Sequence, residues 1–139
     1  MSARMLDRLA DLSGRVALVT GAAGHLGQLF CRVLLEQGAT VYGVDRPAAL
    51  HQLPAGVTAL GAELAAPEAI EQIAEAIAAA GRLDILINNA AFVGTDAHPG
   101  WGVPFEEQSV ETWRNCLEVN LTVPFALVQR LTPLLRASG

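Results

Sequence analysis

The fold is decided by residues 16 to 27, which read Val16-Ala17-Leu18-Val19-Thr20-Gly21-Ala22-Ala23-Gly24-His25-Leu26-Gly27. The apolar run at the start does not alternate with polar residues, which is typical of a central parallel strand covered on both faces. A helical pattern follows, so the glycines lie at a strand-to-helix corner. Because glycine allows a sharp turn and the next helix directs its N–H groups at the corner, the stretch predicts a phosphate site. The alternative is a purely structural turn.

Apolar runs and helical patterns alternate along the rest of the chain. Strands are expected at 40–44, 57–64 and 83–87, and helices at 26–37, at 67–80 with Pro67 in the first turn, and at 109–137 with Ser109 as N-cap. This order predicts a parallel sheet with right-handed crossovers, whose ligands bind beyond the carboxyl ends of the strands.

The spacing of apolar residues also predicts the inward faces of the helices. For the first helix the expected face is Leu26, Leu29, Phe30, Val33 and Leu34, and for the second it is Ile70, Ile73 and Ile77. For the last helix it is Trp113, Leu117, Leu121, Phe125, Val128 and Leu131.

Polar residues follow the second and fourth expected strands, at the same edge as the glycine corner. Asp45 ends the second strand, roughly 20 residues after the glycines, where a carboxylate accepts hydrogen bonds from both ribose hydroxyls of a dinucleotide and repels a 2′-phosphate. The alternative is a solvated Asp that opens a loop. Asn88-Asn89-Ala90-Ala91 follows the fourth strand directly.

Asn120 lies within the last helix, four residues before Pro124. Proline has no N–H, so the carbonyl of Asn120 loses its normal donor and a kink is expected. We hypothesise that this carbonyl binds an ordered water at the active edge; the alternative is a helix break without a role.

Composition limits the class of protein. A chain of 139 residues with 52% hydrophobic residues fits one buried α/β domain, expected at 13–139 after an extension at 1–12. The net charge is −5, and all nine positive residues are scattered arginines, which argues against nucleic acid as a partner. The N-terminus has no uninterrupted apolar segment of signal-peptide type and no run spans a bilayer, so a cytoplasmic protein without a membrane partner is expected.

The cysteines and the loop residues give weaker signals. Cys31 and Cys116 have no Cys or His at ligand spacing, so buried free thiols and no metal site are expected. In the loop after Ala91, His98 is interpreted as an ordinary loop residue, with a substrate contact as the alternative, and Trp101 as a packing anchor.

Together the glycine corner, Asp45, the Asn88 to Ala91 stretch and Val119-Asn120 resemble the short-chain dehydrogenase/reductase family, over the whole chain from Ser13 onward. The resemblance implies an α/β fold of the Rossmann type, a doubly wound parallel sheet with strand order 3-2-1-4, and a bound NAD, with NADP less favoured. Asn120 would be the catalytic asparagine that orders a water, and Leu26 would lie beneath the nicotinamide. The cofactor-binding residues implied are Gly21, Ala23, Gly24, His25, Leu26, Gly27, Asp45, Arg46, Glu63, Leu64, Asn89, Ala90 and Ala91.

Three positions depart from the family pattern. His25 stands at the place of the middle glycine, so the corner is similar to that of the extended branch, which acts on nucleotide sugars; Asn88-Asn89-Ala90 and the short interval to Asn120 favour the non-extended branch. Glu63-Leu64 replaces the common Asp and apolar pair at the adenine. Ala91 replaces a glycine.

The family reaction also needs a Tyr-x-x-x-Lys pair, in which lysine lowers the tyrosine pKa. The chain contains one tyrosine, Tyr42, and no lysine. We therefore expect the cofactor-binding part of an oxidoreductase that acts on a small alcohol or carbonyl substrate, inactive by itself. A non-catalytic dinucleotide-binding module and part of a nucleotide-sugar epimerase or dehydratase are the alternatives. The resemblance implies that the helix at 109–137 is a contact through which a homo-oligomer could form.

Overall fold

The computed structural model describes residues 10–93 and 98–138. Four strands form one parallel sheet in the order β3-β2-β1-β4. Their bounds are β1 Val16–Thr20, β2 Thr40–Asp45, β3 Thr58–Gly61 and β4 Ile85–Ile87. The sheet confirms the α/β class and the strand order expected from the resemblance.

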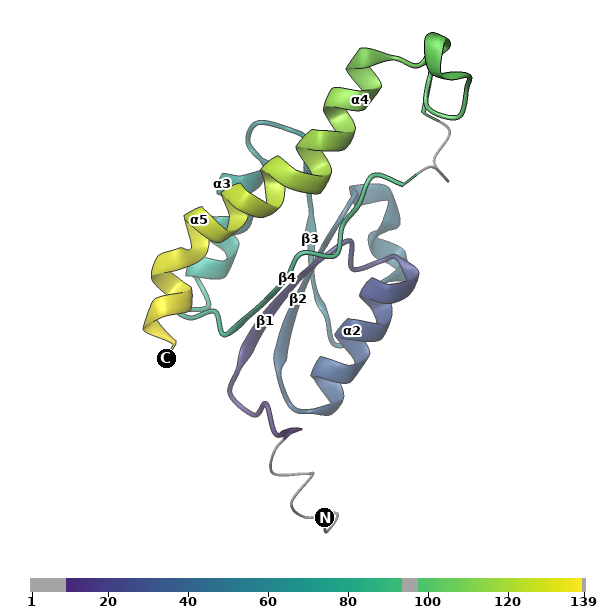
Figure 1. Cartoon of the computed structure of the whole chain (residues 1–139). Helices are drawn as coiled ribbons and strands as arrows, with labels where there is room; N and C mark the ends of the chain where they lie inside the picture. Colours follow the sequence, from purple (N-terminus) through teal and green to yellow (C-terminus); the bar gives the residue numbers. More distant parts are fainter. Residues whose placement is uncertain (1–9, 94–97, 139) are drawn as a thin grey trace.

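Helices cover both faces of this sheet (Figure 1). On one face lies α2, His25–Glu36, and on the other lie α3, Ala69–Ala78, and α5, Val123–Ala137. The long C-terminal helix has three parts, because a π-helical turn at Glu118–Thr122 joins α4, Val110–Leu117, to α5. Two 3₁₀ turns, η1 Pro47–Gln52 and η2 Phe105–Glu107, complete the described elements.

β1 explains the two layers of the core. All five of its residues are buried, and their side chains alternate between the faces of the sheet. Val16 and Leu18 belong to the cluster that α3 and α5 cover, whereas Ala17 and Val19 belong to the cluster under α2. A central strand buried on both faces reads as a continuous apolar run, as the sequence predicts.

Several predicted boundaries are wrong by a few residues. The fourth strand begins at Ile85 instead of residue 83, because its pairing with β1 begins at Ile85. The third strand stops at Gly61 instead of continuing to residue 64, because its partner β2 ends at Asp45, opposite Gly61. The second helix begins at Ala69, so Pro67 precedes the cap residue Glu68 and lies outside the first turn. The reason is a pair of turns before the helix, closed by hydrogen bonds from the amide of Ala66 to the carbonyl of Glu63 and from the amide of Ala69 to that of Ala66.

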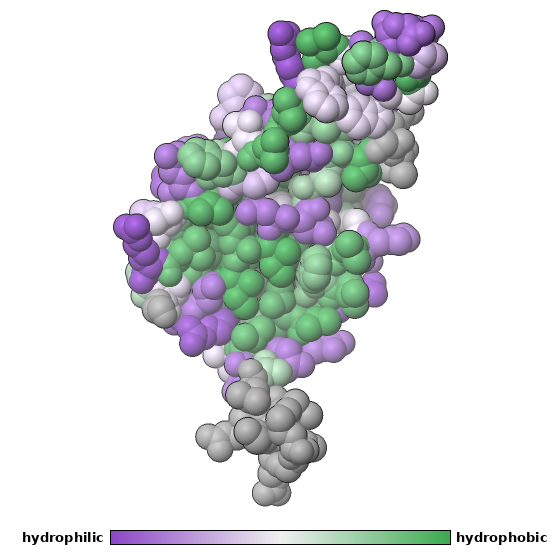
Figure 2. Space-filling model, viewed as in Figure 1, coloured by the Kyte–Doolittle hydropathy of each residue, from purple (hydrophilic) through white to green (hydrophobic). Residues whose placement is uncertain are grey.

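The predicted inward face of α2 is only partly correct. Leu34 is buried, but Leu26 is 61% exposed and Leu29 and Val33 are also exposed. The helix instead packs through Gly27, Cys31 and Leu34, because a glycine at the corner lets its small-residue face approach the strand. Figure 2 shows an apolar surface between α5 and α2.

The predicted inward stripe of the last helix is mostly wrong. Leu131 is buried as expected, but the other five predicted residues are exposed, namely Trp113, Leu117, Leu121, Phe125 and Val128. The buried row is the neighbouring one, Thr112, Cys116, Val123, Leu127 and Leu131. Both rows are apolar at helical spacing, so periodicity alone does not choose between them.

The π-helical turn also departs from the unbroken α-helix expected at 109–137. It is closed by a hydrogen bond from the amide of Val123 to the carbonyl of Glu118, five residues earlier. It precedes Pro124, where the sequence predicts a kink. Because a proline removes one donor from the helix, a local change of hydrogen-bond pattern accommodates it.

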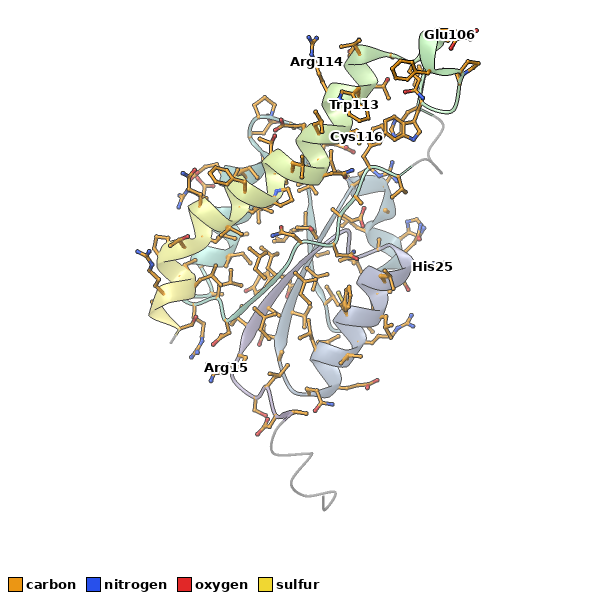
Figure 3. The ribbon with its side chains drawn as sticks, viewed as in Figure 1. Arg15, His25, Glu106, Trp113, Arg114 and Cys116 are labelled. Atoms are coloured by element: carbon orange, nitrogen blue, oxygen red, sulfur yellow. The ribbon has the colours of Figure 1, made fainter. Side chains whose placement is uncertain are left out.

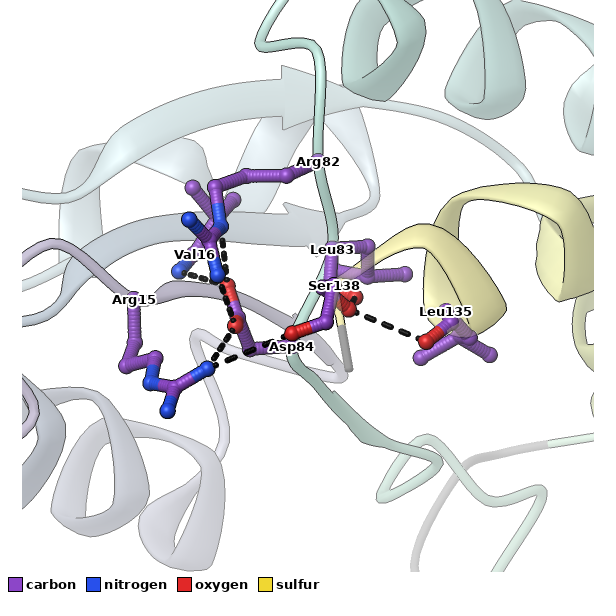
Figure 4. Close-up of polar contacts among 7 residues, drawn as sticks. All are labelled: Arg15, Val16, Arg82, Leu83, Asp84, Leu135 and Ser138. Atoms are coloured by element: carbon purple, nitrogen blue, oxygen red, sulfur yellow. Dashed lines mark hydrogen bonds and ion pairs between the residues drawn. The ribbon is translucent and has the colours of Figure 1, made fainter.

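A buried carboxylate joins the elements at the end of the sheet opposite the glycine corner (Figure 4). Asp84 accepts hydrogen bonds from the guanidinium groups of Arg82 and Arg15 and, at 2.8 Å, from the amide of Val16. The Arg82 guanidinium, the Val16 amide and Arg15 together hold the pKa of Asp84 well below its usual range. Ser138, the C-cap of α5, attaches the end of this helix to the segment before β4, because its hydroxyl donates a hydrogen bond to the carbonyl of Leu83.

Both cysteines are buried and unpaired, as predicted. Burial raises the pKa of the Cys31 thiol to about 11, so this thiol is protonated at neutral pH. Within residues 10–93 and 98–138, no cluster of His, Cys, Asp and Glu is suited to hold a metal ion. In the same residues, no helix has the length and apolar character needed to cross a bilayer.

Candidate functional site

The glycine corner connects the carboxyl end of β1 to the start of α2. Gly21 has a φ of +64°, a conformation that side-chain-bearing residues rarely adopt. Gly24 is the N-cap of α2, and no side chain caps the helix there. The amides of His25, Leu26 and Gly27 form the first helical turn and have no acceptor inside the helix, so they are available to an anion at the corner.

The absence of a side chain has a different physical consequence at each of the three glycines. A Cβ on Gly21 would lie 2.8 Å from the Cα of Ala90, and one on Gly27 would lie 2.0 Å from the carbonyl oxygen of Gly21. A Cβ on Gly24 would meet only the Gly21 oxygen, at 3.3 Å. The fold itself therefore requires Gly21 and Gly27, whereas the absent side chain of Gly24 leaves room for a ligand beside the helix N-terminus.

Asp45 faces this corner from the end of the neighbouring strand. Its Oδ2 accepts a hydrogen bond from the amide of Ala23 at 2.9 Å, and its Oδ1 accepts one from the amide of Arg46 at 2.8 Å. These bonds orient a partly exposed carboxylate toward the turn that precedes α2. The Ala23 amide, a predicted cofactor contact, is thus already paired with the protein.

Asn89 ties β4 to the corner. Its Nδ2 donates to the carbonyls of Thr20 and Gly21, at 3.0 Å each. The Thr20 hydroxyl oxygen accepts from the amides of Asn89 and Ala90, both at 3.1 Å. The predicted residues Asn89 and Ala90 therefore act on the shape of the corner, while Ala91 beside them is exposed.

Asn120 reaches from the π-helical turn to the chain just after β4. Its Oδ1 accepts a hydrogen bond from the amide of Phe92 at 2.7 Å, and its Nδ2 donates to the carbonyl of Phe92 at 3.2 Å. The same Nδ2 lies 3.4 Å from the sulfur of Cys116, within hydrogen-bonding reach. The side chain thus fixes the loop, which leaves only its main-chain carbonyl for the predicted water.

The remaining predicted residues lie at the same edge of the sheet but differ in exposure. Arg46 follows Asp45 and is exposed, and Glu63, just beyond β3, is exposed as well. Leu64 is half-buried against the core cluster under α3 and α5. His25 and Leu26 are exposed at the start of α2, beside the corner; His25 is labelled in Figure 3.

Sequence reasoning assigned no role to Thr20, Phe92 or Cys116. In the structure Thr20 is 2% exposed. The available sequence signal was a hydroxyl residue at the end of an apolar strand, directly before the glycines. The pairing of Phe92 with Asn120 joins residues far apart in the chain and has no local signal. Trp101, predicted to be a packing anchor, does pack against aromatic rings.

The model of the short chain dehydrogenase family matches residues 15–139. The chain belongs to the short-chain dehydrogenase family. Family membership confirms the resemblance, and the matched residues include the corner, Asp45 and Asn120.

Curated relatives of this short-chain dehydrogenase extend well beyond it. It is 37% identical over 137 residues to the rhamnolipids biosynthesis 3-oxoacyl-[acyl-carrier-protein] reductase of Pseudomonas aeruginosa, covering 93% of this chain and 51% of the relative. It is 35% identical over 132 residues to the 1-deoxy-11-beta-hydroxypentalenate dehydrogenase of Streptomyces arenae, covering 86% of this chain and 46% of the relative. The chain spans about half the length of the curated relatives it matches.

Solved structures of other short-chain dehydrogenases share the fold. The Pseudomonas aeruginosa RhlG/NADP active-site complex has a TM-score of 0.78 and 35% identity, covering 94% of this chain and 51% of that chain. A metagenomic short-chain oxidoreductase in complex with NADP has a TM-score of 0.75 and 30% identity, covering 91% of this chain and 58% of that chain.

Proposed function

We propose that this chain is the nicotinamide-dinucleotide-binding part of a short-chain oxidoreductase and that it prefers NAD to NADP. The observation that carries the proposal is the carboxylate of Asp45, which faces the glycine corner and is held there through the Ala23 amide. The uncapped first turn of α2 suits the pyrophosphate, and the open position of Gly24 leaves space for it. The bound cofactor supplies or accepts a hydride; the residues of this chain bind and orient it.

Preference for NAD rests on charge. A ribose with both hydroxyls free donates hydrogen bonds to Asp45, whereas a 2′-phosphate brings two like charges together at the strand end. Two of the solved relatives are NADP complexes, so NADP is the direct competitor. The exposed Arg46 is the nearest cation in sequence, but Asp45, held by the Ala23 amide, keeps a negative charge at the strand end.

The substrate class that we propose is a small alcohol or carbonyl compound; the names of two relatives, a 3-oxoacyl reductase and a hydroxypentalenate dehydrogenase, support a reaction between an alcohol and a carbonyl group. Asn120 contributes through its main-chain carbonyl, which Pro124 deprives of an N–H donor and which we propose to hold an ordered water near the reacting group. The chain has no lysine, so we propose that these 139 residues bind the cofactor without completing hydride transfer.

Calorimetric titration of the whole chain with NAD and with NADP tests the proposal. We expect saturable binding of both and at least tenfold tighter binding of NAD, because an added 2′-phosphate faces Asp45. Tighter binding of NADP contradicts the assigned role of Asp45. No binding of either dinucleotide contradicts the proposal as a whole.

We also propose that the exposed apolar stripe of the long C-terminal helix, which runs over α4, the π-helical turn and α5, is a contact between copies of the chain. The stripe includes Leu121, 63% exposed, and Phe125, 67% exposed. Surfaces of this kind mark interaction sites. Sedimentation velocity is expected to show a concentration-dependent dimer that the double substitution Leu121→Ser, Phe125→Ser abolishes; a monomer at all concentrations contradicts this assignment.

A further inference from the structure

β3 forms the edge of the sheet opposite β4. It pairs with β2, and no strand of the described part of the chain lies on its other side. The amide of Ala62, just after β3, donates to the carbonyl of Asp45 in β2 at 3.0 Å. Because the polar groups of successive strand residues point to opposite sides, Ala59 and Gly61 direct their N–H and carbonyl groups away from β2. Both residues are exposed, so this edge is able to pair with another strand.

The edge contains no residue of the kinds that block such pairing. Lysine, proline and other charged residues commonly protect an edge strand, whereas the four residues of β3, Thr58–Gly61, are uncharged and include no proline. A strand of this length offers few backbone hydrogen bonds. A ligand of this edge therefore also needs side-chain contacts.

A hollow between β3 and α3 supplies a place for one side chain. Its volume is about 180 Å³. An apolar cavity of about 150 Å³ holds a benzene ring, so the hollow has room for a leucine-sized side chain. The lining residues come from the strand end and from the first half of α3, and all but Gln72 are apolar: Ala59, Leu60, Gly61, Ala62, Gln72 and Ile73.

The side of α3 that carries Gln72 is acidic. Glu68, Gln72 and Glu75 are four and three residues apart, so they lie along one side of the helix. All three are exposed, and within the described residues neither Glu68 nor Glu75 forms an ion pair. Arg130 of α5 is paired with Glu71, at 2.6 Å. The rim of the hollow therefore carries negative charge without a partner cation.

We propose that the edge of β3 binds an extended segment of a partner protein in which basic residues lie on both sides of an apolar one. The segment adds a strand to the sheet, places its apolar side chain in the hollow and pairs its basic side chains with Glu68 and Glu75. These glutamates are about 10 Å apart along the helix, and residues i and i+4 of a strand are about 13 Å apart. Two arginines at that spacing therefore reach both carboxylates.

The same charges disfavour a second copy of this chain as the occupant. Two β3 strands paired antiparallel about a two-fold axis would set the acidic sides of the two α3 helices against each other, and the net charge of the chain is −5. None of the residues that line the hollow is a proposed cofactor contact. The proposal therefore does not rest on the proposed function.

Fluorescence anisotropy of a labelled peptide, Thr-Arg-Thr-Leu-Thr-Arg-Thr, titrated with the whole chain tests the proposal. Alternation places both arginines and the leucine on one face of the extended peptide. The control peptide, Thr-Arg-Leu-Thr-Thr-Arg-Thr, has the same composition and charge but turns the leucine to the other face. We expect saturable binding of the first peptide and at least tenfold weaker binding of the second. Equal binding of the two peptides, or no saturable binding, overturns the proposal.

Ala59→Pro removes an outward N–H group from the edge but no hydrogen bond to β2. It should weaken binding of the first peptide at least tenfold. Ala55→Pro is the matched control, because Ala55 is exposed in a turn that a hydrogen bond from the amide of Val57 to the carbonyl of Pro54 closes, where proline is favoured. Both variants should keep the circular dichroism spectrum of the parent chain, and equal peptide binding by the two contradicts pairing at this edge.

The double variant Glu68→Gln, Glu75→Gln tests the charges without altering the strand, since both side chains are exposed. It should weaken binding of the first peptide about fivefold at low salt. The control Glu36→Gln, Glu111→Gln removes the same charge at exposed positions of α2 and α4 and should keep the parental affinity. Equal affinities of the two double variants overturn the choice of a basic partner.

Two further measurements separate this site from the others. Saturating NAD should leave peptide binding unchanged; competition places the peptide at the cofactor site and overturns the proposal, while the proposed function stands. Failure of the chain to bind NAD, with peptide binding as expected, contradicts the proposed function alone. Self-association in sedimentation velocity that Ala59→Pro abolishes identifies a second copy as the occupant and overturns the proposal of a basic partner.

Discussion

The side-chain amide of Asn120 pairs with both backbone polar groups of Phe92, accepting from its N–H at 2.7 Å and donating to its carbonyl at 3.2 Å. These bonds connect a π-helical turn on one face of the sheet to the chain that leaves β4. The predicted catalytic residue is therefore also the residue that fixes the adjoining loop. A substitution of Asn120 therefore alters both the position of the loop and the proposed catalytic role.

Asn120→Ala should destabilise the chain by about 2 kcal/mol, because it leaves the partly buried N–H and carbonyl of Phe92 without their partner. Urea unfolding measures this loss. The tryptophan emission should also change, since Phe92 packs against Trp101. Asn115→Ala, at an exposed position of α4, is the control and should change neither quantity. If Asn120→Ala has the unfolding free energy and the tryptophan emission of the parent chain, Asn120 does not fix the loop.

Gly27→Ala should disrupt the glycine corner, because the added Cβ would lie 2.0 Å from the Gly21 oxygen and 2.7 Å from the Cα of Ala22. Both neighbours are backbone atoms, so helix and strand have to separate, at a cost of about 1–3 kcal/mol. Thermal unfolding gives the stability.

The matched control is Gly24→Ala, where the nearest atom is 3.3 Å away. It should keep most of the stability but weaken NAD binding, because it places a methyl group at the proposed pyrophosphate position. If Gly24→Ala binds NAD as well as the parent chain, Gly24 has no part in the site.

Asp45→Asn should narrow the preference for NAD over NADP by at least tenfold, because it removes the negative charge that faces the 2′ position. The amide oxygen still accepts from the Ala23 amide, so the corner is kept. Calorimetric titration with both cofactors gives the two affinities. Arg136→Gln, at an exposed position near the end of α5, is the control and should leave NAD affinity within about twofold. An unchanged preference in Asp45→Asn would contradict the proposed role of Asp45 in the choice of cofactor.

Asp84→Asn should cost about 2 kcal/mol at neutral pH through its charged hydrogen bonds to Arg82, Val16 and Arg15. The pKa of Asp84 is lowered in the folded chain, so its stabilising effect is present above the unfolded value of about 4 and decreases as pH falls toward the folded value. Urea unfolding between pH 7 and pH 2 should therefore show a steeper acid loss in the parent chain than in the variant.

Glu71→Gln is the comparison for this acid dependence. Glu71 pairs with Arg130 at an exposed position, where solvent screens the interaction. Its substitution should leave the pH dependence close to that of the parent chain. If Glu71→Gln and Asp84→Asn reduce the pH dependence of the unfolding free energy equally, Asp84 contributes no more to acid stability than an exposed ion pair.

Much of the fold was predictable because its signals are local. The continuous apolar run of β1 indicates a strand buried on both faces, the glycines mark the corner, and Ser109 is the N-cap, its hydroxyl accepting from the Thr112 amide as expected. Asp45 was also predictable, because a βαβ unit of ordinary length returns the second strand beside the first. Its role toward the cofactor stays a prediction.

The exposed faces of the helices were not predictable in the same way. Trp113 and Phe125 lie at helical spacing beside a second apolar row that contains Leu127. Periodicity counts apolar residues around a helix, but only the volume and position of the surface that receives the helix decide which row is buried.

The sequence by itself determined the parallel α/β sheet and the edge at which the candidate residues gather, because covalent geometry and local periodicity specify strands, helices and turns. The strand order was predicted from the resemblance to the family. Only the tertiary structure decided that Asn120 holds Phe92, that Phe92 packs against Trp101 and that Asp84 draws two arginines together. Each of these contacts joins segments separated along the chain, and their distances depend on how the helices pack on the sheet.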